Sequence, residues 1–138
     1  MKTRRPPSLL RILLAASLAL ASAAHAAGDK DAYKKAKAEA ATAYDRQHRE
    51  CDGEQTRNAK KVCLLQSEAD LARAREGAEV AYQDTDRARA TAARRIAEAD
   101  YKVAKQKCND QPADARDGCA KQARTAFEQA RTAPVGKQ

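Results

Sequence analysis

The chain has 138 residues and a mass of 15.0 kDa, enough for one small domain. It carries 27 Lys and Arg residues against 19 Asp and Glu, and after residue 26 only nine residues are Leu, Ile, Val or Phe. This composition excludes a thick apolar core, a β-sandwich and a Rossmann fold. Because Ala, Glu, Lys, Arg and Gln fill long stretches without proline, helix is favoured over the alternative of disorder.

The N-terminus has the pattern of an export signal. A basic head precedes an apolar run over residues 9–21, and Ala24-His25-Ala26 has the small-x-small form of a cleavage site. The sequence therefore predicts a cleaved signal peptide at residues 1–26, using general secretion, and no transmembrane segment in the mature chain. Cleavage would remove four basic residues and no acidic one, which leaves a net charge of +4. Because this charge is small and residues of both signs alternate along the chain, nucleic-acid binding is not expected.

Residues 27–82 are predicted to form the first of two helical hairpins. Alanines at helical spacing lead to Tyr44 and Cys51 on one face of the incoming helix. Asp52-Gly53 then interrupts the pattern, and Asn58 offers an N-cap for the outgoing helix.

Residues 83–132 repeat this arrangement. The first part of the repeat matches at a shift of 57 residues and the second part at a shift of 56, with the change falling in the link between the two cysteines. The matched pairs include Tyr44 with Tyr101, Cys51 with Cys108, Cys63 with Cys119, and Leu71 with Phe127. We therefore expect an all-α fold of two tandem hairpins, followed by a disordered tail at residues 133–138.

The segment between the two cysteine pairs contains no proline. We expect it to form one long central helix shared by both hairpins, which gives a Z-shaped rod of three helices. A break near Gly77 or at Gln83-Asp84 would instead give an elongated four-helix bundle, and the sequence leaves both arrangements open.

Four cysteines in an exported chain indicate disulfides. In one continuous helix the Cα atoms of Cys51 and Cys63 would lie about 18 Å apart, whereas a disulfide needs about 4.4–6.8 Å. A bond within each pair therefore requires a chain reversal. We expect Cys51–Cys63 and Cys108–Cys119, because the repeat then gives two equivalent stapled hairpins, each bridge contributing roughly 3 kcal/mol.

The sequence predicts neither an active site nor a cofactor. Zinc would require pairs at C-x2-C or C-x4-C spacing, and a thioredoxin-like dithiol would require C-x-x-C. His48 lies three residues before Cys51, so a metal pair or a Cys-His dyad is the alternative to a solvent-facing histidine beside a structural half-cystine. We favour the structural interpretation, because a bonded cysteine is no nucleophile, and we expect no metal site.

The largest side chains are expected to form the packing and interaction face of the helices. The tyrosines are candidates for a stacking platform, but packing in a thin helical interface is the favoured interpretation. The predicted face comprises Tyr33, Tyr44, Leu71, Tyr82, Ile96, Tyr101 and Phe127.

Each repeat contains Tyr-x6-Cys, continues with a polar link to a second cysteine, and goes on into a helix rich in Ala, Lys and Glu. In the first repeat the link ends in Asn-Ala-Lys-Lys-Val-Cys at residues 58–63, and the same order of features recurs at residues 101–119. This arrangement is similar to small exported proteobacterial proteins with paired-cysteine repeats and no assigned role, which are often described as TolA-like, after a protein of the cell envelope. The resemblance covers most of the chain after the leader. It implies a periplasmic location in a Gram-negative bacterium and no catalytic residues.

These features lead us to expect a non-enzymatic periplasmic helical protein that acts as a structural or interaction module of the cell envelope. Its Ala/Tyr faces would pack, as in a coiled coil, on a protein partner or on a second copy of the chain. The alternative is an ATP-independent periplasmic chaperone or envelope-stress protein, although the scarcity of Leu, Met and Phe counts against it. A third alternative is a metal-handling protein that uses His48 with Asp and Glu residues.

Overall fold

The computed structural model describes residues 28–132, which form four α-helices and no strand. The α-helices are α1 (Lys30–Glu50), α2 (Arg57–Gln83), α3 (Asp86–Lys107) and α4 (Arg116–Thr132), and two short 3-10 helices, η1 (Cys51–Gly53) and η2 (Cys108–Asp110), follow α1 and α3. The all-α class is therefore confirmed for this part of the chain. The predicted signal peptide at residues 1–26 and the predicted tail at residues 133–138 lie outside the described residues.

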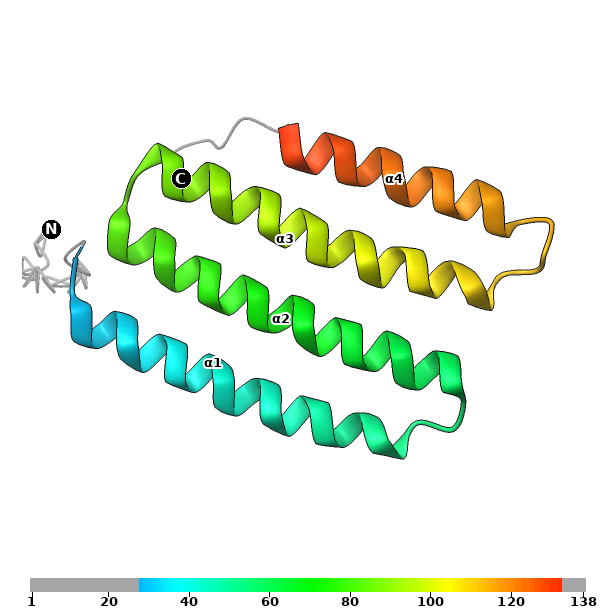
Figure 1. The fold of residues 1–138 in the computed structure, drawn as a ribbon, viewed down its shortest axis with the longest axis horizontal. Helices are drawn as coiled ribbons and strands as arrows, with labels where there is room; N and C mark the ends of the chain where they lie inside the picture. The colour runs from blue at the N-terminus through cyan, green and yellow to red at the C-terminus, as the bar shows by residue number, and fades with distance from the viewer. Residues whose placement is uncertain (1–27, 133–138) are drawn as a thin grey trace, which may run out of the picture.

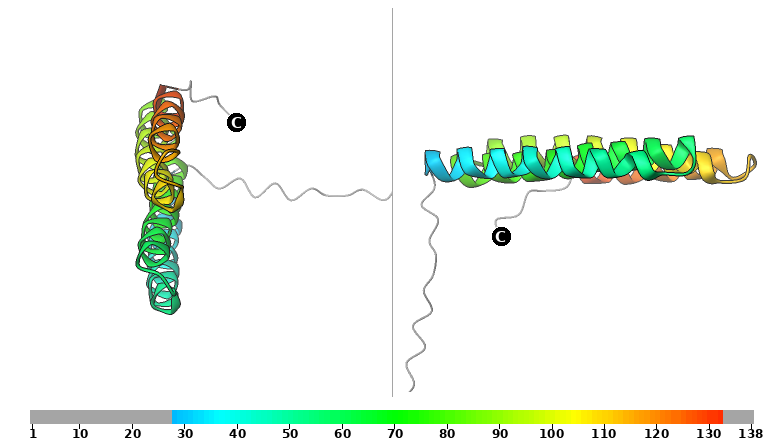
Figure 2. Two further views of the ribbon diagram at one scale, coloured as in Figure 1. Left: turned by 90° about the vertical axis from the view of Figure 1, so that its right-hand side faces the viewer. Right: turned by 90° about the horizontal axis from the view of Figure 1, so that it is seen from below.

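The four helices lie side by side in chain order, and each runs antiparallel to the next (Figure 1). Seen along its edges, the molecule is a single layer one helix thick (Figure 2). α2 packs between α1 and α3, and α3 packs between α2 and α4, with the α2–α3 seam the most extensive of the three. Both broad faces of the layer are therefore left without a covering helix from the described residues.

Small side chains fill the seams between the helices. The buried apolar residues are Ala40, Cys51, Ala69, Ala88, Ala92, Ala97, Val103, Cys108 and Ala123. Alanine has a short side chain, so it lets two helices approach closely while burying only a narrow stripe. An inner helix can bury one such stripe on each side, which explains how a chain with few large apolar residues forms a packed structure.

The expected shared central helix is wrong, because α2 and α3 are separate helices. Asp84 ends α2 in the left-handed conformation, with φ 43° and ψ 44°. The Thr85 hydroxyl then accepts a hydrogen bond from the backbone amide of Ala88, 3.1 Å away, and so caps the start of α3. The turn falls at one of the two breaks that the sequence left open, whereas Gly77 lies within α2.

The break gives four helices, as the alternative arrangement predicts, but they form a flat layer instead of an elongated bundle with a common core. A bundle requires an apolar stripe on each helix that points toward one common core. Here the buried residues of α3 include Ala92 and Ala97, five positions apart, so the helix buries opposite sides against α2 and α4. Two narrow stripes on opposite sides of a helix give a layer, because neither stripe alone can close a core.

The link between α2 and α3 is reinforced by charge. Arg89 donates hydrogen bonds to Asp84 over 2.6 Å and to Asp86 over 2.8 Å. The hydrogen bond to Asp86, and then that to Asp84, raise the pKa of Arg89 above its ordinary value. The guanidinium therefore stays charged and ties the turn to the first helical turns of α3.

We expect Asp84→Val to lower the free energy of unfolding by about 1–2 kcal/mol, because a β-branched side chain is strained in the left-handed region. Asp84→Asn should cost less, since asparagine tolerates this conformation. Urea unfolding followed by circular dichroism would measure both. The matched control is Gln83→Val in the last turn of α2, where we expect a loss below about 0.7 kcal/mol. Equal losses at the two positions would contradict the assigned backbone strain.

The first and second repeats are also joined at the end of the molecule that holds the disulfides. Thr56 caps α2 by accepting from the Ala59 amide over 3.0 Å, so Asn58 is not the cap that the sequence indicated. Instead the side-chain amide of Asn58 donates to Asp110 in η2 over 2.5 Å, and it accepts from Gln106 of α3. Asn58 therefore bridges the two repeats.

Candidate functional site

Two disulfides hold the reversals of the chain. Cys51 ends α1 and is bonded to Cys63 of α2, and Cys108 ends α3 and is bonded to Cys119 of α4. The Cα atoms are 5.6 Å apart in both bridges. This pairing is the one that the sequence predicts. Cys51 is fully buried, so its sulfur serves as packing material as well as a cross-link.

His48 is exposed on α1, and its ring lies 5.4 Å from the ring of Tyr44. The sulfur of its neighbour Cys51 is committed to the bond with Cys63, so a Cys-His dyad has no thiol to use. Within residues 28–132 no group of three or more His, Cys, Asp or Glu residues is placed to hold a metal ion. His48 therefore contacts an aromatic ring, and the nearby cysteine has no free thiol that the imidazole could activate.

A charged pair spans the first reversal. Lys60 of α2 donates to Asp52 of η1 over 2.8 Å. This hydrogen bond, and then the charge of Lys60, lower the pKa of Asp52 below its ordinary value. A depressed pKa in the folded state means that the pair stabilises the fold above about pH 3.9, the unfolded value, and that this stabilisation is lost as the pH falls through the folded value.

We expect Lys60→Gln to raise the titration midpoint of the Asp52 carboxyl, because the variant removes both the donor and the positive charge. Carbon-detected NMR across the acid range would measure it. Lys61→Gln is the matched control, since Lys61 is the exposed neighbour and should leave the midpoint unchanged. An Asp52 midpoint that is the same in the two variants would contradict the assignment of its pKa shift to Lys60.

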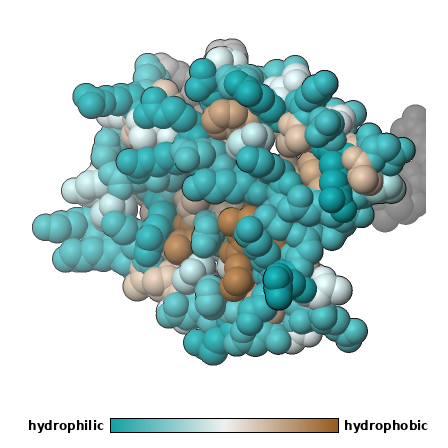
Figure 3. Space-filling view, turned by 45° about the vertical axis from the view of Figure 1, so that its right-hand side comes forward, coloured by the Kyte–Doolittle hydropathy of each residue, from teal (hydrophilic) through white to brown (hydrophobic). Residues whose placement is uncertain are grey.

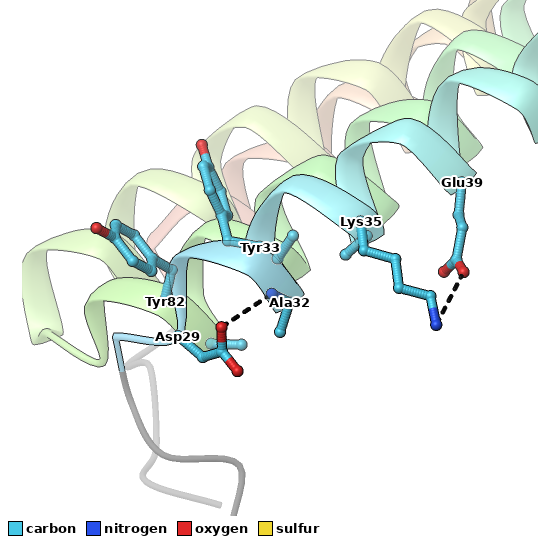
Figure 4. Close-up of a pocket in the computed structure, with 9 residues that line it drawn as sticks. Asp29, Ala32, Tyr33, Lys35, Glu39 and Tyr82 are labelled. Carbon is cyan, nitrogen blue, oxygen red and sulfur yellow. Dashed lines mark hydrogen bonds and ion pairs between the residues drawn. The ribbon is translucent and has the colours of Figure 1, made fainter.

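Two tyrosines meet at the opposite end of the layer. Tyr33 of α1 and Tyr82 of α2 stack with ring centroids 4.8 Å apart. Tyr33 donates its hydroxyl hydrogen to Glu79 over 2.5 Å, and Lys37 donates to the Tyr33 oxygen over 3.1 Å. Beside these rings lies a shallow groove, whose other rim carries the Lys35–Glu39 ion pair (Figure 4). The contacts staple α1 to α2 far from the disulfide.

Ion pairs set the register between α2 and α3. Arg73 donates to Asp100 over 2.6 Å, and Arg95 donates to Glu76 over 2.8 Å. Glu76 is only 9% exposed, and its hydrogen bond and then its charge raise the pKa of Arg95. The partners are 27 and 19 residues apart in the chain, so no local sequence pattern indicated either pair.

Four of the predicted face residues lie at one level across the layer. Counted from the first disulfide, Tyr44 lies seven residues back along α1 and Leu71 eight residues on along α2. Counted from the Arg73–Asp100 pair, Leu71 lies two residues back and Tyr101 one residue on. The Tyr101 ring in turn stacks on that of Phe127 at 5.2 Å. These four residues, Tyr44, Leu71, Tyr101 and Phe127, form what we call the apolar band.

Tyr44 and Leu71 lie on one face of the layer, and the repeat indicates the same face for their equivalents in the second hairpin, Tyr101 and Phe127. Tyr44 and Leu71 line a groove that also reaches Arg95, so the groove crosses α1, α2 and α3. All four members of the band are half-buried, and none is enclosed. In a space-filling view of the molecule, a few hydrophobic side chains lie among predominantly hydrophilic ones (Figure 3).

The remaining predicted face residues lie apart from the band. Tyr33 and Tyr82 form their own pair toward the end of the layer that holds the α2–α3 turn. Ile96 is half-buried on α3, five residues or about 7.5 Å along the helix from Tyr101. The structure therefore divides the predicted face into a tyrosine pair, the apolar band and Ile96.

The outer edge of the layer at α4 is polar. On α2 the seam with α3 contains Ala69, which is 1% exposed, and Glu76. The repeat places Thr125 and Thr132 of α4 at the equivalent positions, where both are exposed and line an open groove with charged neighbours. In repeat proteins such polar outer faces cap an array and end its growth. The α4 edge is therefore closed to further packing of the kind seen between α2 and α3.

No helix within residues 28–132 combines the length and the hydropathy needed to cross a bilayer. No protein-family model, curated protein or solved structure matches the chain.

Proposed function

We propose that the protein is a non-enzymatic structural or interaction module of the bacterial cell envelope that acts in the periplasm. The observation that carries this proposal is the apolar band, which places four large side chains at one level on an uncovered face of the layer. Compact domains cover such a face with a second layer. A half-exposed band of aromatic and aliphatic side chains within a charged surface is typical of a protein-binding site.

The disulfides support the compartment. Two bonded pairs in a chain of this size are typical of proteins that fold in an oxidising environment. The export pattern at residues 1–26 and the resemblance to TolA-like envelope proteins point to the periplasm. The tandem hairpin arrangement serves this function by holding four helices flat, so that the band spans all of them.

Site-specific photocrosslinking in intact cells tests the proposal. A photoreactive phenylalanine analogue at Tyr44 should give one adduct of defined mass in the periplasmic fraction. The matched control is the same analogue at Thr42, which is exposed and lies about 200° around α1 from Tyr44. N-terminal sequencing of the same material should show cleavage after Ala26.

The adduct pattern separates the candidate functions. A single adduct from Tyr44 and none from Thr42 supports an interaction module. A ladder of unrelated adducts would instead indicate the general chaperone. Recovery of the protein in the cytoplasm with free thiols, or equal labelling at both positions, would overturn the proposal.

A further inference from the structure

We infer that the apolar band is a self-association surface, on which two copies of the chain stack face to face about a two-fold axis that runs along the seam between α2 and α3. This inference rests on the proposed function as an interaction module and names the partner. Stacking two such layers would give each copy the second layer that its own helices do not provide.

A two-fold axis in this position makes the band self-complementary. It places α2 over α3 of the second copy, and α1 over α4 of the second copy, without changing the level along the helices. Leu71 then faces Tyr101 of the second copy, and Tyr44 faces Phe127 of the second copy. The match requires all four residues to lie at one level, which the disulfides, the Arg73–Asp100 pair and the Tyr101–Phe127 stack establish.

Charged residues on the same face of the layer obey the same symmetry. Glu68 and Arg75 of α2 line the groove that contains Leu71. Thr91 of α3 lines a neighbouring groove, and Glu76 and Arg95 line both grooves. Glu98 and Lys105 follow Thr91 at intervals of seven residues, so they lie on that face of α3.

The positions of these charged residues along the helices indicate the kind of partner. Counted from the Arg73–Asp100 pair, Glu68 and Lys105 each lie five residues, or about 7.5 Å, toward the disulfide end. Arg75 and Glu98 each lie two residues the other way. Each acid is therefore level with a base on the neighbouring helix, and the two-fold axis brings it over that base in the second copy. An isologous dimer requires this kind of self-complementarity.

The polar α4 edge supports the same geometry, because it removes edge-to-edge growth as the competing mode of self-association. A chain with one capped edge and one self-complementary face forms a closed pair and not a filament.

Sedimentation equilibrium of the purified protein, with both disulfides intact, tests the inference. The protein should be a dimer. Leu71→Glu should weaken the dimer by at least about 30-fold, because it puts a charge at the centre of the band. Thr42→Glu, on the far side of α1, should leave the dissociation constant unchanged. Circular dichroism should show the same helix content in all three proteins.

A charge exchange provides a second test that does not disturb apolar packing. Glu68 and Lys105 are both exposed, so their substitution leaves the fold intact. Lys105→Glu should weaken the dimer by roughly 10-fold, and the double variant with Glu68→Lys should restore it to within about threefold. Restoration is expected only if the two residues face each other across the interface.

The outcomes are distinct from those of the crosslinking experiment. A monomer at all concentrations, a dimer that is insensitive to Leu71→Glu, or a double variant no tighter than Lys105→Glu would each overturn the two-fold stack. A monomer whose Tyr44 position crosslinks to one different protein would overturn this inference while leaving the proposed function standing. A dimer with the expected responses and no other adduct would support both, with the second copy as the partner.

Discussion

Removal of the first disulfide by the paired substitutions Cys51→Ala and Cys63→Ala is expected to lower the free energy of unfolding by about 3 kcal/mol. The bridge closes a loop of 12 residues and holds α1 against α2. In a single layer α1 is an edge helix and packs chiefly along its α2 seam. The loss should therefore be concentrated in α1, which contributes only Ala40 to the buried residues.

Hydrogen exchange of the oxidised protein and of the variant would measure this effect helix by helix. Amides of α1 should lose protection while those of α3 and α4 keep it. The matched control is removal of Cys108–Cys119, which should free α4 in the same manner and leave α1 protected. Uniform loss of protection over all four helices in both variants would show that the layer unfolds as one unit and would contradict separate stapling of the edges.

The second large effect is expected from overpacking of an alanine seam. Ala69 is 1% exposed in the contact between α2 and α3. Leucine at this position must either force the helices apart or distort its own rotamer, so we expect Ala69→Leu to cost about 1–3 kcal/mol. Separation would also strain the Glu76–Arg95 and Arg73–Asp100 pairs, which bridge the same seam.

Urea unfolding would measure the difference. Ala74→Leu is the matched control, because Ala74 lies on α2 and is exposed, and its change should stay within about 0.5 kcal/mol. An Ala69→Leu variant as stable as Ala74→Leu would mean that the seam is loose, and the close approach of α2 and α3 would then be contradicted.

Alanine seams and disulfides answer the same physical problem. A narrow contact between small side chains buries little apolar surface, so each helix gains little from its neighbour. The cross-links at both reversals reduce the entropy of the unfolded chain and compensate for that shortage. The few large side chains lie half-buried where α1 meets α2 and where α3 meets α4, so part of each stays available to a partner.

Several parts of the fold were predictable because they depend on neighbours in the sequence. The cysteine spacing requires a reversal, and the repeat selects the pairing of Cys51 with Cys63. Helix boundaries were less predictable. Thr56 and not Asn58 caps α2, since Asn58 is recruited by Asp110, 52 residues away. Gly77 is a poor helix former but sits inside α2, whereas the left-handed Asp84 ends it.

The arrangement of the candidate site was not predictable from the sequence. The sequence singled out the largest side chains, but that they form one interaction face stays a prediction, and the structure groups them into the tyrosine pair, the apolar band and Ile96. It could not place Leu71 level with Tyr101, because that depends on the register in which α2 packs against α3. The ion pairs that set this register join residues far apart in the chain, and their spacing follows no helical period.

By itself the amino-acid sequence determined the helical class, the two equivalent cysteine-linked reversals and the shortage of large apolar side chains, because each depends on local preference or on spacing along the chain. Only the tertiary structure decided that the helices form one flat layer and that four large side chains align across it. The physical reason is that each inner helix buries narrow stripes of small side chains on two opposite sides, as Ser67 and Ala69 do on α2 and Ala92 and Ala97 do on α3. Whether two stripes close a core or extend a layer depends on contacts between helices, which no single helix encodes.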